Sequence, residues 1–174
     1  LPQRAEIEFD VRLAAGGELR QVRSDPELLP EAPVGGETLL PRPTWLQAAT
    51  DASTYVIPAG RWRLERPLEL PRGKALRLEA GCELLLGPEA RVLVRGVLEA
   101  RGTAERPVVV RSAQATSPGP ALTVLRGGQA VLRHFHMVGA EPGGGGRGLA
   151  LYEVKAELSD CRFSGLGVGA AVRA

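Results

Sequence analysis

Two short stretches of the chain, residues 134–136 and 160–162, carry side chains that could do chemistry together. His134 and His136 are the only histidines, and Asp160 and Arg162 repeat the same two-residue spacing further on. An imidazole can accept a proton and a guanidinium can neutralise a carboxylate, so this set could process or bind an acidic sugar. Together with Gln114, which we expect in file with His136, these residues form the candidate binding site. A solvated sheet face is the plainer interpretation, and the sequence favours it.

Other kinds of site lack the residues they need. A glycoside hydrolase usually places two carboxylates about 5 to 9.5 Å apart. Asp160 is the only aspartate after Asp51, and Glu153 and Glu157 are expected on other parts of the fold. Two histidines and two distant cysteines do not supply the three or four ligands of a metal site. We therefore predict no catalytic residues, no metal and no cofactor.

The residues that must position this site alternate between apolar and polar side chains. From residue 76 to residue 110, apolar side chains recur at every second position, which is the period of a β-strand and not of a helix. Short breaks at Gly81, Gly96 and Gly102, and at the Gly-Pro of 87–88, separate the strands. The resulting inward pairs are Leu76/Leu78, Leu84/Leu86, Val92/Val94, Leu98/Ala100 and Val108/Val110.

The strands repeat with one period along the chain, in three columns offset by 21 to 27 residues per step. The first column runs from Tyr55 through Leu98, Leu122 and Leu149 to Ala170. The second comprises Trp62, Leu84, Val108, Ala130 and Ala156, and the third comprises Leu68, Val92, Ala113, Phe135 and Cys161. Such a repeat predicts a parallel β-helix, in which each coil contributes one strand to each of three sheets.

The repeat resembles a known class of proteins. The run from Leu76 to the GTAERPVVVRS that ends at Ser112, and the later ALYEVKAELSDCRFSG of 150–165, are similar to coils of secreted bacterial right-handed parallel β-helix proteins of the pectin-lyase-like class. The resemblance covers residues 55–174. The chain has no asparagine, so the asparagine ladders common in that class are missing. Because many activities share this scaffold, the resemblance implies a fold and not a function.

The columns also predict what lies outside and inside the coils. Leu85, Val109 and Val131 would follow one another on the exterior of the second column, and such an apolar strip is normally covered. Cys82 and Cys161 would point inward about three coils apart, which is about 14 Å at about 4.8 Å per strand. A disulfide needs Cα atoms closer than about 7 Å, so we predict two separate buried thiols.

Residues 1–54 do not keep the repeat, and we predict that they cap the first coil. Alternation over 7–13 and 19–22 favours a β-hairpin, and the prolines of 24–43 favour an extended strap. Either this strap covers the apolar strip, or another domain or subunit does. Thr44 could begin a short capping helix over 44–52. Alternatively, residues 1–25 are the tail of an upstream module. We expect residues 55–174 to form the β-helix, with more coils beyond the last residue.

Composition narrows the partners. The net charge is only +2 from 22 basic and 20 acidic residues, and aromatic residues make up 4% of the chain. A nucleic-acid-binding protein usually has a clustered basic excess, and no run of 18 apolar residues suggests membrane insertion. We therefore expect neither partner. The low aromatic content also means that stacking platforms for sugars, as for bases, are scarce, and a polysaccharide is the one ligand class that we consider.

Taken together, the sequence predicts an all-β right-handed parallel β-helix of about five coils with an N-terminal cap. The function it favours is a non-catalytic scaffold or binding module for glycans, secreted or at the cell surface with the periplasm as an alternative, and attached to further domains. A polysaccharide lyase or glycoside hydrolase is the first alternative. A rigid spacer in a fibre or appendage is the second.

Overall fold

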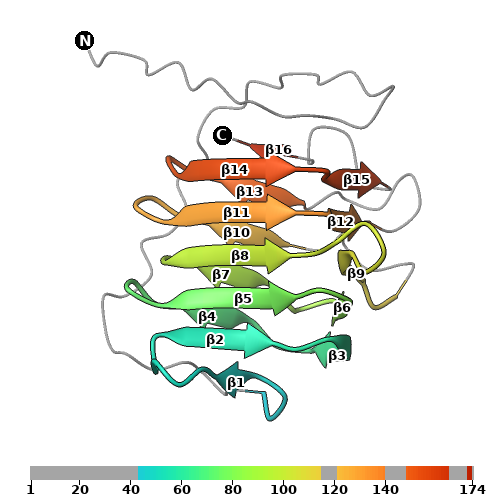
Figure 1. Ribbon diagram of the computed structural model, residues 1–174, viewed down its shortest axis with the longest axis horizontal. Helices are drawn as coiled ribbons and strands as arrows, with labels where there is room; N and C mark the ends of the chain where they lie inside the picture. Colours follow the sequence, from blue (N-terminus) through green and yellow to red (C-terminus); the bar gives the residue numbers. More distant parts are fainter. Residues whose placement is uncertain (1–42, 115–120, 140–147, 165–171, 174) are drawn as a thin grey trace.

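The computed structural model describes residues 43–114, 121–139, 148–164 and 172–173. These residues form β-strands joined by turns, and they contain no helix. Accordingly, no helix in the described ranges is long and apolar enough to cross a membrane. The strands wind into a parallel β-solenoid, as predicted, with about four turns where about five coils were expected (Figure 1).

Three sheets run along the solenoid, and successive strands of the chain visit them in the order A, B, C. Figure 1 shows sheet A facing the viewer, sheet B at its right end and sheet C behind it. Sheet A contains β1 (Gln47–Ala48), β2 (Thr54–Ile57), β5 (Ala75–Glu79), β8 (Val97–Arg101), β11 (Gln129–Arg133) and β14 (Lys155–Ser159). Sheet B contains β3 (Gly60–Leu64), β6 (Cys82–Leu86), β9 (Val108–Ser112), β12 (Phe135–Val138) and β15 (Arg162–Ser164). Sheet C contains β4 (Leu68–Leu70), β7 (Val92–Val94), β10 (Leu122–Val124), β13 (Leu149–Leu151) and β16 (Val172–Arg173).

The core follows directly from the alternation in the sequence. In the central strands, such as β5, β6, β8 and β11, the residues at every second position point inward, and they stack on their counterparts one coil away, as Leu76 does on Leu98. Phe135 and Met137 are fully buried in the same way. Cys82 and Cys161 are buried, unbridged thiols, as predicted, and burial raises their pKa to about 12 and about 11.

The strands of the predicted columns lie in the right sheets up to β9 and in the wrong sheets after it. Within β9 the predicted register is also wrong by two residues, because Leu84 pairs with Val110 and not with Val108. Sheet A continues from Leu98 to Ala130 and then to Ala156, whereas the sequence pattern put both alanines behind Leu84 in the second column. The reason lies at Ala113, which follows β9 and does not begin a third strand. The third strand of that coil is β10, so every later strand moves by one sheet.

The predicted capping helix at 44–52 is wrong. The chain turns at Thr44 and forms β1, which pairs antiparallel with β2 and covers the free edge of sheet A. Leu46 is buried, and the rings of Trp45 and Trp62 stack with centroids 5.9 Å apart. These contacts between apolar side chains fix the segment better than one exposed helical turn would. The expected hairpin, and the strap up to residue 42, lie outside the described residues.

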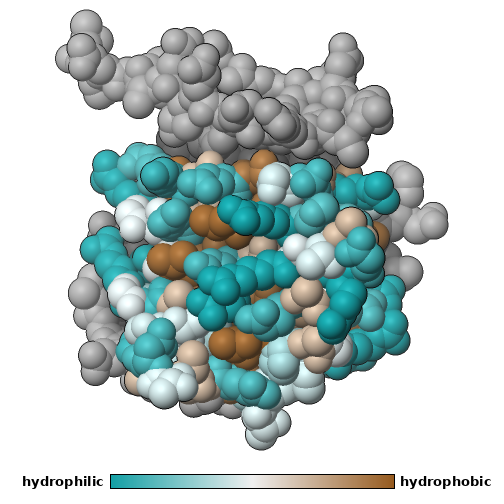
Figure 2. All heavy atoms as spheres, viewed as in Figure 1, coloured by the Kyte–Doolittle hydropathy of each residue, from teal (hydrophilic) through white to brown (hydrophobic). Residues whose placement is uncertain are grey.

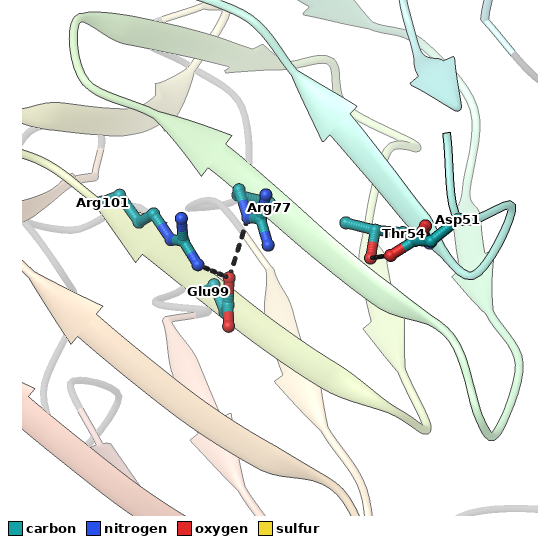
Figure 3. A network of polar contacts seen from close by, with 5 residues as sticks. All are labelled: Asp51, Thr54, Arg77, Glu99 and Arg101. Carbon is teal, nitrogen blue, oxygen red and sulfur yellow. Dashed lines mark hydrogen bonds and ion pairs between the residues drawn. The ribbon is translucent and has the colours of Figure 1, made fainter. Parts of the chain in front are cut away.

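A carboxylate organises the turn between β1 and β2. Asp51 accepts hydrogen bonds from the backbone N–H groups of Ser53 and Thr54 and from the Thr54 hydroxyl, each at 3.0 Å. Figure 3 shows the hydrogen bond from the Thr54 hydroxyl. The Thr54 hydrogen bonds lower the pKa of Asp51. This is the role that aspartate often takes in turns, because its short side chain reaches the backbone two or three residues ahead.

The outer face of sheet A pairs its charges across strands. Arg77 and Glu99 face each other on adjacent coils with Nε and Oε2 2.9 Å apart, as the repeat predicts, and Arg101 contacts the same oxygen at 3.1 Å (Figure 3). Figure 2 shows this face as mostly hydrophilic, with separate hydrophobic patches. Ion pairing on this face engages Arg77 and Arg101 with Glu99.

Candidate functional site

The sequence-predicted site lies at the corner between sheets A and B, which we call the A–B corner. His134 and Asp160 occupy equivalent turn positions one coil apart, with φ of 44° and 53°. Non-glycine residues seldom adopt this left-handed conformation, and histidine and aspartate are among those enriched there. The His134 Nε2 and an Asp160 carboxylate oxygen are 3.8 Å apart. The turn therefore brings two of the predicted residues together for a conformational reason.

His136 and Arg162 also meet, on the outer face of sheet B. They are direct partners in the register of β12 and β15. Burial lowers the pKa of His136, and the nearby positive charges of Arg162 and His134 lower it further. A neutral imidazole beside a guanidinium can accept a hydrogen bond from a ligand whose anionic group contacts the arginine.

Gln114 does not join them. It follows β9 as an exposed residue, and β12 aligns His136 with Val109 instead. The prediction failed because it assigned Gln114 to a third strand that does not exist at this point. Four of the five predicted binding residues thus remain near one corner.

The A–B corner also brings together two carboxylate side chains, where the sequence predicted only one. A hollow of about 410 Å³ is lined by both His134 and Asp160, and Glu157 of β14 opens on the same hollow. Glu157 was expected on another part of the coil. Because the hollow extends from the corner onto sheet A, an outward residue of β14 can reach it. Glu153, in contrast, lies between sheets C and A and pairs with Arg126.

The predicted apolar strip is not formed. Leu85 aligns with arginines 63 and 111 on sheet B, and Val109 aligns with Glu83 and His136 in a different row. Val131 lies on sheet A between two glutamates, 99 and 157. Two errors explain this result. The two-residue register error in β9 separates Val109 from Leu85, and the later column shift assigned Val131 to the wrong sheet. No cover from residues 24–43 is required for a strip of these three side chains.

A second candidate site, which the sequence analysis missed, lies at the corner between sheets C and A. We call it the C–A groove. It is an open groove of about 550 Å³ that runs from Ser53, just before β2, past the turns before β5, β8 and β11 to the first residue of β14. The residues lining it are Ser53, Arg72, Gly73, Lys74, Ala75, Arg95, Gly96, Val97, Gly127, Gly128, Gln129 and Lys155.

Glycines make the floor of the C–A groove. A Cβ added to Gly96 would stand less than 3.0 Å from the carbonyl oxygen of Lys74, and one added to Gly128 would stand 2.6 Å from that of Gly96. Successive turns therefore stack too closely for any side chain at these positions. Gly73 and Gly127 have φ of 73° and 80° and face open space. As a result, a ligand in the groove can approach the backbone closely.

The walls of the C–A groove are basic. Arg72, Lys74, Arg95 and Lys155 line it, and no aspartate or glutamate does. Arg95 forms an ion pair with Glu69, with its Nε 2.9 Å from the carboxylate oxygen. In the part of the chain that the structure describes, Arg72, Lys74 and Lys155 make no ion pair. The sequence offered a signal, because the chain has only two lysines among its 22 basic residues and both line this groove.

Across the described ranges, no three His, Cys, Asp or Glu side chains lie close enough together to hold a metal ion. Comparisons of the chain with protein-family models, with curated proteins and with solved structures returned no match. The function has to be argued from the two corners themselves.

Proposed function

We propose that this chain is a non-catalytic β-helix scaffold and binding module whose ligand is a polysaccharide. The observation that carries the proposal is the C–A groove, which stays open along four coils and is floored by backbone. A compact metabolite needs an enclosing pocket, where most of its surface is buried. An open groove parallel to a solenoid suits an extended chain, which gains affinity by repeating modest contacts.

The scaffold suits such a role because it is held by strand pairing at every coil. The backbone ladder continues through the corners, where the His134 N–H donates to the Ser159 carbonyl oxygen at 3.0 Å. Sites on regular elements keep their geometry better than sites on loops. The resemblance of the repeat to pectin-lyase-like proteins supports placement in a secreted or cell-surface protein of several domains.

One experiment tests binding and catalysis together. The protein is incubated with neutral and acidic polysaccharides, and both retention on immobilised polymer and the appearance of new reducing or unsaturated ends are measured. The proposal expects retention without new ends. Retention by none of the polymers would contradict it and would favour the rigid-spacer alternative.

An enzyme is the second candidate, and the hollow at the A–B corner favours it. Glu157, Asp160 and His134 share that hollow, so a polysaccharide hydrolase or lyase has a carboxylate pair and a base to draw on. Against it, both carboxylates are exposed, whereas the acid of a glycosidase normally lies in enclosed, apolar surroundings. New chain ends that disappear in both Asp160→Asn and Glu157→Gln would establish the enzyme.

A further inference from the structure

We infer that the C–A groove binds an anionic polysaccharide, carboxylated or sulfated, laid along the solenoid axis, with Lys74 and Lys155 as its main charge contacts. This inference rests on the proposed polysaccharide binding and adds the ligand class and the site. Its first support is charge. The groove collects basic side chains from successive coils and contains no carboxylate.

The lysines are available to a ligand in a way that the arginines of the sheets are not. On sheet B, the Glu83 carboxylate forms ion pairs with both Arg61 and Arg111, each with a distance of 2.6 Å between the arginine Nε and a carboxylate oxygen. Lys74 instead directs its ammonium at the Ala52 carbonyl oxygen at 3.1 Å, and an ammonium has three donors. The neutral contact holds Lys74 in place and leaves donors for an anion. Lys155 is exposed, and no ion pair engages it among the described residues.

The spacing of the groove fits a polymer. Ala75, Val97, Gln129 and Lys155 are successive partners in sheet A, so three strand steps of about 4.8 Å separate the level of Lys74 from that of Lys155. That distance of about 14 Å exceeds what one small anion can bridge. A chain with a charged group on several consecutive sugars can contact both lysines at once.

The neutral groups of the groove favour sugar over nucleic acid. Ser53 and Gln129 offer a hydroxyl and an amide, which can bond sugar hydroxyls as donor and acceptor. No aromatic side chain lines the groove, whereas proteins that bind single strands stack bases on aromatic rings. The glycine floor lets sugar hydroxyls reach backbone groups. These features suit a hydroxyl-rich polyanion without bases.

The experiment compares the full chain with two double variants. Lys74→Gln/Lys155→Gln removes the two groove charges. Arg66→Gln/Arg91→Gln removes two exposed charges near the B–C corner, where neither arginine makes an ion pair within the described residues. Polygalacturonate, dextran sulfate, neutral dextran and single-stranded DNA are the probes, at low and at physiological salt. Unfolding midpoints confirm that all proteins are equally folded, and Lys74→Arg/Lys155→Arg keeps the charge.

The expected result is that at least one acidic polysaccharide binds more tightly than dextran and loses about tenfold in affinity in the lysine variant. The arginine variant should lose less than about twofold, the Lys→Arg variant should bind nearly as well as the wild type, and salt should weaken binding. Polygalacturonate and dextran sulfate separate the carboxylated from the sulfated ligand.

Each of the other outcomes contradicts a different part of the inference: the groove assignment, the ligand class or polysaccharide binding itself. If the acidic polymers bind the lysine variant as well as the wild type, or if dextran binds equally tightly, the groove assignment is wrong while polysaccharide binding stands. If DNA binds most tightly and depends on the lysines, the groove is an anion-binding site but the ligand class is wrong. If no polysaccharide binds at all, the proposed function falls together with this inference.

Discussion

The A–B and C–A corners are built on the same backbone ladder, yet their turns present opposite chemistry. At the A–B corner the left-handed positions hold His134 and Asp160, whose side chains on neighbouring coils approach to 3.8 Å. At the C–A corner, Gly96 and Gly128 remove side chains from the turns, and cations stand at the rim without carboxylates among them. In a solenoid, therefore, the residue types at one set of stacked turns decide whether the side chains of that corner interact with each other or stay available to a ligand.

The largest expected effect concerns the glycine floor. Gly96→Ala places a Cβ against the Lys74 carbonyl oxygen, and the clash is with backbone that belongs to the sheet ladder. Inserting atoms into a packed site costs about 1 to 3 kcal/mol and sometimes more, so we expect a loss of about 3 kcal/mol in the free energy of unfolding. Chemical denaturation measures it.

Gly73→Ala is the matched control at the same corner. Its Cβ would face open space, but φ is 73°, so only the left-handed conformation is penalised, by about 1 to 2 kcal/mol. If Gly73→Ala destabilises the protein as much as Gly96→Ala, close stacking is not the reason for glycine in the floor.

The A–B corner gives the next largest effect. His134 has φ of 44°, which a β-branched residue tolerates poorly, so His134→Val should lose about 1 to 2 kcal/mol of stability. His134→Gly should be nearly neutral, because glycine adopts this conformation freely. His136→Val, two residues along in an ordinary strand, should cost less than His134→Val in the same thermal unfolding measurement. Equal losses at 134 and 136 would mean that the side-chain contacts, and not the turn conformation, select the histidine.

A smaller effect, which depends on pH, is expected at His136 on sheet B, next to the A–B corner. The pKa of His136 lies below 6.5 in the folded protein, first because of burial and then because of Arg162. The folded state thus takes up this proton less readily than the unfolded state does. Its stability contribution is intact above about pH 6.5 and is lost as pH falls through the lowered pKa. NMR titration of Arg162→Gln should show the His136 pKa rising towards its ordinary value. An unchanged pKa would mean that the charge of Arg162 does not contribute to the lowering of the His136 pKa.

The sequence predicted each strand better than it predicted where strands stack. Alternation is local, so Leu84, Ala130 and Phe135 were all correctly placed inside. The sheet that a strand joins depends on every turn before it, and one false strand at Ala113 displaced all later columns. The cap failed for a related reason, because the stacking of Trp45 on Trp62 decides the shape of that segment and is not local.

The same distinction explains what was found of the sites. Four residues of the A–B corner were predicted because they fall within two short stretches that the repeat aligns. The C–A groove draws on turns of four coils, so no short window contains it. A search for rare residue types would have helped, since Lys74 and Lys155 fall at equivalent edges of sheet A.

The smallest effect is expected on the face between the two corners. Arg77, Glu99 and Arg101 lie about one-quarter to one-half exposed, and pairs of this kind contribute about 0.2 to 1 kcal/mol. A double-mutant cycle with Arg77→Gln and Glu99→Gln should give a coupling free energy in that range. Glu99→Gln alone should cost more than Arg77→Gln, because it frees two arginines, and added salt should reduce the difference. A coupling well above 1 kcal/mol would mean that something shields this face. The A–B and C–A corners would then not be the only places where the charges of the solenoid are used.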